Sequence, residues 1–79
     1  MDAKNLIYLN TIEQNNAKWY IYGKINEDDP SYVGIYVQKQ GIGIIDMVIG
    51  VKFEEGWRDI AAGPIIDFIN STEGDPRYE

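Results

Sequence analysis

The chain has 79 residues, no cysteine, no histidine and a formal net charge of −6. This length suits one small domain, and the two missing residue types exclude disulfides, thiol nucleophiles, and imidazole bases or metal ligands. The negative charge disfavours direct contact with nucleic acid or an anionic membrane and favours basic partners.

No stretch approaches the roughly 20 apolar residues of a membrane span. The first residues lack the basic start and the apolar run of a secretory signal. We therefore expect a cytoplasmic protein without a membrane partner.

Residues 5–13 are ambiguous between helix and strand, because their apolar side chains spread around a helical wheel instead of forming one stripe. A strand is favoured because the run is short and ends near Asn15 and Asn16, a pair typical of tight turns. The next segment, 18–25, alternates between apolar and polar residues and is rich in aromatic and β-branched side chains. The two segments together predict a β-hairpin.

Residues 26–31 are turn-forming, and the segments 32–39 and 42–53 alternate again as half-buried strands. Because a one-residue slip reverses every side chain, like faces must pair. Placing Ile25 opposite Val33 then brings Tyr22 opposite Tyr36. A short turn at residues 40–42 gives three further pairs: Val37 with Ile45, Ile35 with Met47, and Tyr36 with Asp46.

An amphipathic helix is predicted after the last strand, with Pro64 either kinking it or dividing it into two short helices. Residues 73–79 are rich in turn-forming and acidic residues and predict a loose acidic tail. The predicted fold is α+β: one domain over residues 1–72, with a four-stranded antiparallel β-meander and the helix on one face. The apolar stripe of the helix comprises Trp57, Ile60, Ala61, Pro64, Ile65, Phe68 and Ile69.

The sheet face away from the helix is the candidate interaction surface. Tyrosine combines a large contact area with a polar tip and is enriched at recognition surfaces. The alternative is a set of exposed cross-strand pairs that only stabilise the sheet. In one register of the first hairpin, Ile7 and Leu9 also join this face. The predicted partner-binding residues are Tyr20, Tyr22, Tyr32, Tyr36 and Asp46.

Acidic residues concentrate at the end of the chain. Residues 1–53 hold six acids and five lysines, whereas residues 54–79 hold seven acids and two arginines. One hypothesis is that Glu54, Glu55 and Asp59 imitate the phosphates of a nucleic acid and block the basic cleft of a nucleic-acid-binding protein. The other is that the acidic surface only aids solubility.

The preferred function is that of a small acidic, non-catalytic binding protein, such as an inhibitor, that docks on another protein or on a second copy of itself. The alternatives are the nucleic-acid mimic and a carboxylate-dependent enzyme, since any two of the thirteen acids could meet. No cofactor or metal is predicted, because the acidic loop 27–29 lacks the spacing of a calcium loop.

Overall fold

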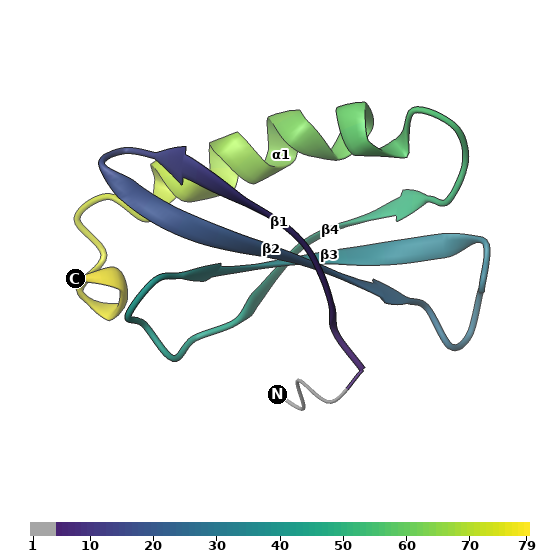
Figure 1. The fold of residues 1–79 in the computed structure, drawn as a ribbon, viewed down its shortest axis with the longest axis horizontal. Coiled ribbons are helices and arrows are strands. Elements are labelled where there is room, and N and C mark those ends of the chain that lie inside the picture. The colour runs from purple at the N-terminus through teal and green to yellow at the C-terminus, as the bar shows by residue number, and fades with distance from the viewer. Residues whose placement is uncertain (1–4) are drawn as a thin grey trace.

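The computed structural model describes residues 5–79, and these form one open antiparallel sheet with a helix across one face (Figure 1). The strands follow one another in sheet order as they do in the chain, which confirms the predicted α+β meander. The elements are β1 (Ile7–Gln14), β2 (Ala17–Ile25), β3 (Tyr32–Lys39), β4 (Asp46–Lys52), α1 (Trp57–Ser71) and the short 3₁₀ helix η1 (Pro76–Tyr78).

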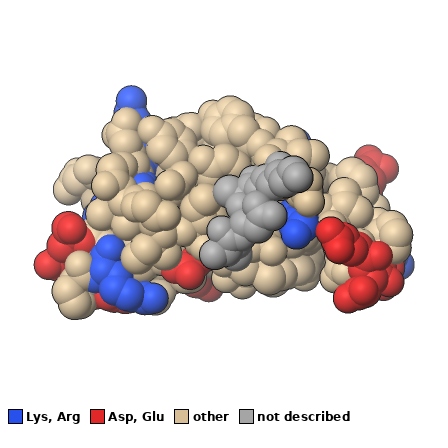
Figure 2. Space-filling view, turned by 90° about the horizontal axis from the view of Figure 1, so that it is seen from below, with Lys and Arg blue, Asp and Glu red and all other residues tan. Residues whose placement is uncertain are grey.

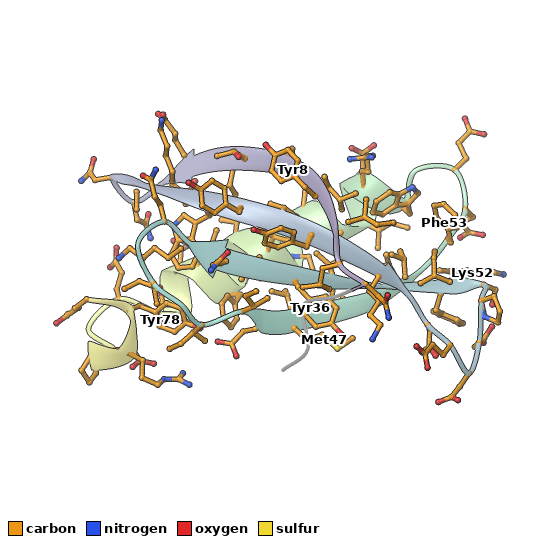
Figure 3. The ribbon with its side chains drawn as sticks, turned by 60° about the horizontal axis from the view of Figure 1, so that its bottom comes forward. Tyr8, Tyr36, Met47, Lys52, Phe53 and Tyr78 are labelled. Carbon is orange, nitrogen blue, oxygen red and sulfur yellow. The ribbon has the colours of Figure 1, made fainter. Side chains whose placement is uncertain are left out.

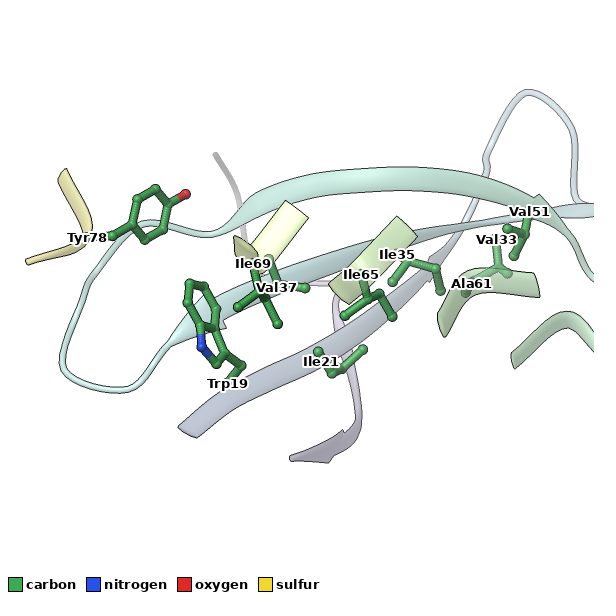
Figure 4. Packing of buried hydrophobic residues seen from close by; sticks show 10 residues of the cluster. All are labelled: Trp19, Ile21, Val33, Ile35, Val37, Val51, Ala61, Ile65, Ile69 and Tyr78. Atoms are coloured by element: carbon green, nitrogen blue, oxygen red, sulfur yellow. The ribbon is translucent and has the colours of Figure 1, made fainter. Parts of the chain in front are cut away.

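The hydrophobic core lies between α1 and the sheet. The helix buries Ala61, Ile65 and Ile69, which recur every four residues and so lie on one line of the helix surface. They pack against buried side chains that alternate along the strands (Figure 4). The core comprises these three residues with Trp19, Ile21, Val33, Ile35, Val37, Val51 and Tyr78.

The first hairpin confirms the strand interpretation of residues 5–13. Asn15 and Asn16 have φ angles of 55° and 63°, the left-handed conformations that a two-residue turn between twisted strands requires. An irregularity between Tyr8 and Asn10 then shifts the pairing with β2. It places Ile7 opposite Gly23 and Leu9 against the core, so these two side chains do not join the open face.

The β2–β3 register is the predicted one, with Tyr22 opposite Tyr36, but the predicted β3–β4 register is wrong. Strand β4 begins at Asp46 instead of Ile42, because residues 40–45 form a longer connection between β3 and β4 than the expected short turn. Val48 is an extra residue without a partner on β3, so the pairing shifts within the strand. The observed pairs are Ile35 with Ile49, Tyr36 with Met47, and Val37 with Asp46.

The helix α1 bears on two details of its prediction, at Pro64 and at Ile60. It continues through Pro64 as one element of 15 residues, so there is no division into two helices. Ile60 is 55% exposed, because the single sheet contacts one line of the helix and Ile60 lies off that line. Within residues 5–79, no helix is both long and apolar enough to cross a membrane.

The prediction of a loose tail over residues 73–79 is wrong, because Tyr78 packs into the core. Tyr78 is only 1% exposed, and its ring lies 5.8 Å from that of Trp19. Its hydroxyl donates a hydrogen bond to Asp46, and its carbonyl accepts one of 2.7 Å from Lys39 Nζ. Asp75 starts the 3₁₀ helix by accepting a hydrogen bond from the Arg77 N–H.

Candidate interaction site

The sheet face opposite α1, called the open face below, carries a row of large side chains across all four strands. Tyr8 lies opposite Tyr22, Tyr22 opposite Tyr36, and Tyr36 opposite Met47. We call these four residues the tyrosine ladder; Figure 3 looks onto it and labels three of them. Tyr8 and Met47 are 58% and 52% exposed, whereas the two inner tyrosines are half-buried. The ladder is thus an accessible band across the full width of the sheet.

The ends of the ladder are set by the two irregularities in the edge strands. Regular pairing from the Asn15–Asn16 turn would bring Leu9 opposite Tyr22, and the irregularity brings Tyr8 there instead. The extra residue Val48 does the same in β4, where it packs against the core and leaves Met47 on the open face. Sequence reasoning missed both Tyr8 and Met47. The one available signal was Val48, an apolar residue where regular alternation requires a polar one.

Hydrogen bonds hold the ladder in place. The Tyr22 hydroxyl donates to Gln38 Oε1 at 3.0 Å, and Gln38 Nε2 donates to the Ile42 carbonyl at 3.1 Å. At the edge, the Tyr8 hydroxyl and Thr11 Oγ1 are 2.8 Å apart, and the rings of Tyr8 and Tyr22 meet edge to face at 6.3 Å. A surface whose side chains are already held loses less conformational entropy when a partner binds.

A shallow hollow of about 260 Å³ adjoins the ladder. Its floor is a cross-strand pair of glycines, Gly34 and Gly50, where the absence of side chains lowers the surface of the sheet. A Cβ added at Gly34 would lie 3.2 Å from Tyr36 Cε1 and 3.3 Å from Met47 Cε, so both side chains lean over this floor. Its walls include Lys24, Tyr32, Tyr36 and Met47. The open face therefore offers a ridge beside a depression.

The charge of the open face differs from that of the chain. Strand pairing places three lysines and one acid there: Lys18, Lys24, Lys52 and Glu13. Seen from this side, charged groups lie mainly toward the two ends of the molecule (Figure 2). The tyrosine ladder itself is aromatic, apolar and neutral, which is the composition of the centre of a protein–protein interface.

The structure places the predicted tyrosines on the open face but not Asp46. Tyr20 and Tyr32 lie on the open face with the inner tyrosines, opposite Gln38 and Lys52 respectively. Asp46 does not, because the shifted register pairs it with the core residue Val37 and turns it toward Tyr78. Its carboxylate accepts the Tyr78 hydroxyl hydrogen bond on the helix side of the sheet.

The acidic cluster of the alternative hypothesis lies elsewhere. Glu54 and Glu55 are exposed in the turn between β4 and α1, and Asp59 is exposed in the first turn of the helix. Lys52 Nζ is 3.9 Å from Glu54 Oε2, and both side chains are more than half exposed, so this ion pair contributes little. The three acids surround the start of α1, outside the open face.

The acidic loop 27–29 is organised by turn chemistry. Asn26 Oδ1 accepts the N–H groups of Asp28 and Asp29, and Asp29 Oδ1 accepts the Ser31 N–H and hydroxyl. These Ser31 hydrogen bonds hold the pKa of Asp29 below its ordinary 3.8. Within residues 5–79, no three acidic side chains converge as a metal site would require.

We compared the chain with models of protein families, with curated proteins and with solved structures. None of the three comparisons finds a match.

Proposed function

We propose that this chain is a small, non-catalytic binding protein that docks on another protein through its open face, in the manner of an inhibitor or adaptor. The tyrosine ladder is the observation that carries the proposal. For solubility, a sheet with one covered face requires only polar side chains on the other face. This sheet instead presents three aromatic rings and a methionine in one band. Aromatic residues and methionine are enriched in interfaces and are frequent anchors of binding energy.

The partner surface follows from the shape and charge of the open face. The ladder fits a flat apolar strip, and the hollow over Gly34 and Gly50 fits one projecting side chain. Because the face holds three lysines and one acid, a strongly basic partner would find only Glu13 as a complementary charge there. A partner with a basic rim would instead meet the acids near the start of α1. We place this encounter in the cytoplasm, which cell fractionation with an antibody would test.

The second candidate, the nucleic-acid mimic, is favoured by the exposure of Glu54, Glu55 and Asp59 around one turn. It predicts binding that depends on charge and weakens steeply with salt, whereas ladder-centred binding depends weakly on salt. A carboxylate-dependent enzyme has weaker support, since Asp46, the acid within a patterned strand, bonds to Tyr78 instead of a second acid.

Affinity capture with three forms of the protein tests the proposal. The parent is compared with Tyr22→Ser/Tyr36→Ser, which removes the centre of the ladder, and with Glu54→Gln/Glu55→Gln/Asp59→Asn, which neutralises the acidic cluster. Each immobilised form is exposed to lysate, and the retained proteins are identified by mass spectrometry. A retained protein is then purified and its dissociation constant for each form is measured by calorimetry at two salt concentrations.

We expect the tyrosine variant to bind at least about thirtyfold more weakly, which corresponds to the roughly 2 kcal/mol of a central aromatic anchor. The acid-neutralised variant should stay within about threefold of the parent. Loss of binding in the acid-neutralised variant alone would replace the ladder proposal with the mimic. Equal binding of the partner to all three forms would contradict both the ladder proposal and the nucleic-acid mimic.

A further inference from the structure

The two edges of the sheet are protected unequally. At β4, the helix α1 runs alongside the strand, and Asp46 and Lys52 put a charge at each end. Among residues 5–79, β1 pairs with one neighbour, as β4 does, but α1 makes few contacts with it, and Glu13 is its one charged residue. Edge strands that lack lysine, proline and covering elements are templates for pairing with another chain. The free edge of β1 is therefore the more receptive one.

An apolar trough follows this edge on the helix side. One part, of about 200 Å³, lies between β1 and α1 and includes Leu9, Ile12, Trp57 and Ile65 in its lining. A second part of about 310 Å³ adjoins it, and Ile7, which is 61% exposed, lies in its lining. Leu9 and Trp57 line both parts, so the trough is continuous past the middle of the strand.

We propose that β1 pairs antiparallel with β1 of a second copy, joining two sheets into one across a twofold axis. Full overlap of Ile7–Gln14 with itself keeps like faces together in every pair except the one at the axis, because the irregularity at Leu9 shifts the alternation within the strand. Both members of each outer pair then share a face, and the exposed polar pair of Asn10 and Thr11 lies at the axis. The outer pairs are Ile7 with Gln14, Tyr8 with Glu13, and Leu9 with Ile12.

This arrangement accounts for the apolar trough. Leu9 and Ile12 of each copy would meet at the edge where the trough is open, on both sides of the axis. On the open face, the two tyrosine ladders would become neighbours, with each Tyr8 hydroxyl beside the Glu13 carboxylate of the second copy. A phenol hydroxyl and a carboxylate are a suitable hydrogen-bonding pair.

The charge distribution permits this pairing in spite of the net charge of −6. Glu13 lies opposite Lys18 of its own sheet, and Arg58 borders the trough, so this edge carries both signs. An interface of one strand pair and a trough edge is at the small end of stable dimers, so we expect a dissociation constant in the range of about 10–100 μM.

Sedimentation equilibrium from about 5 μM to 1 mM tests the proposal. The variant Asn10→Asp/Thr11→Asp places four carboxylates around the axis, where facing like charges repel. The matched control Gly43→Glu/Gly63→Glu adds the same charge at two exposed glycines outside β1 and outside the lining of the trough. We expect the parent to dimerise, the β1 variant to dimerise at least tenfold more weakly, and the control to remain within threefold of the parent.

Amide hydrogen exchange on the parent provides a test that needs no variant. Exchange within residues 7–14 should slow as the concentration rises through the dissociation constant, while the exposed loop 26–31 should not change. A monomer at 1 mM would overturn the proposal, as would a dimer that is insensitive to the β1 charges. Protection of β1 only by a different protein would assign the edge to a foreign strand. If Tyr22→Ser/Tyr36→Ser still dimerises, dimerisation through β1 does not depend on the tyrosine ladder proposed above as the binding site.

Discussion

The same four strands make two faces that differ in chemistry and in exposure. On the helix side, neighbouring strands contribute Ile21, Ile35 and Val37, all nearly inaccessible to water. On the open side, the residues adjacent to them in the chain, Tyr22 and Tyr36, are half-buried and end in a hydroxyl. The covered face therefore supplies stability. The open face retains contact area that folding does not use, and that area is available for binding.

The largest expected effect comes from the covered face, at Trp19. This side chain is 1% exposed, and Trp19→Ala should reduce the free energy of unfolding by about 3–5 kcal/mol, most of what a domain of this size has. Thermal and urea melts measure the loss. Trp19→Phe should lose much less, because Trp19 Nε1 has no hydrogen-bond partner among residues 5–79 and the ring contact with Tyr78 is kept. Equal melting of the alanine variant and the parent would contradict the core described above.

Adjacent residues on one strand provide a matched comparison of the faces. Ile21→Ala should reduce the free energy of unfolding by about 2–4 kcal/mol, as expected for a fully buried isoleucine. Tyr22→Ala, one residue further and on the other face, should reduce it by about 1 kcal/mol or less. Urea denaturation of both variants measures the difference. A Tyr22→Ala loss as large as that of Ile21→Ala would mean that the ladder is structural.

The hydrogen bond between Tyr78 and Asp46 should have a smaller effect than the core substitution. Tyr78→Phe keeps the buried ring but removes the donor to a carboxylate, which should reduce the free energy of unfolding by about 1.5 kcal/mol. Asp46→Asn should have less effect, because the amide oxygen still accepts the hydrogen bond. If the double variant loses as much free energy of unfolding as the sum of the two single variants, Tyr78 and Asp46 do not interact.

The smallest expected effect lies outside both faces, at Asp75. Hydrogen bonds from the side chain and backbone of Arg77 hold the pKa of Asp75 below its ordinary 3.8. A carboxyl with a lowered pKa in the folded state adds stability above pH 3.8, and this is lost as the pH falls through the folded-state pKa. Carbon-detected NMR titration should place the midpoint below 3.8, and Arg77→Ala should return it toward that value.

Sequence reasoning could recover most of the fold, because the signals are local. The alternation in residues 18–25 and 32–39, the Asn15–Asn16 turn and the helical spacing after Trp57 each depend on neighbouring residues. The four predicted tyrosines were placed on the correct face for the same reason.

The remaining features depend on three-dimensional packing. A single extra residue, such as Val48, redirects every side chain on one side of it, and its position depends on which apolar groups fit beneath the helix. Tyr78 stands alone in a polar segment, so no periodicity indicates its burial. Only its proximity to Trp19 and Asp46 in the folded chain explains it.

One pair of glycine substitutions tests most directly whether the open face binds while the covered face stabilises. Gly50→Leu fills the hollow, and the new Cβ would lie 3.8 Å from Met47 Cε, an ordinary contact. Gly63→Ala adds a methyl group to α1 where, apart from its chain neighbours and the adjacent helix backbone, no atom of residues 5–79 lies within 4 Å. Both should leave the melting temperature unchanged or raise it, because glycine weakens strands and helices by about 0.5–1 kcal/mol.

The measurement is the dissociation constant for the captured partner, obtained by calorimetry beside the melting curves. We predict that Gly50→Leu binds at least tenfold more weakly than the parent while remaining folded, and that Gly63→Ala binds as the parent does. Full affinity in a folded Gly50→Leu variant would contradict the assignment of binding to the open face.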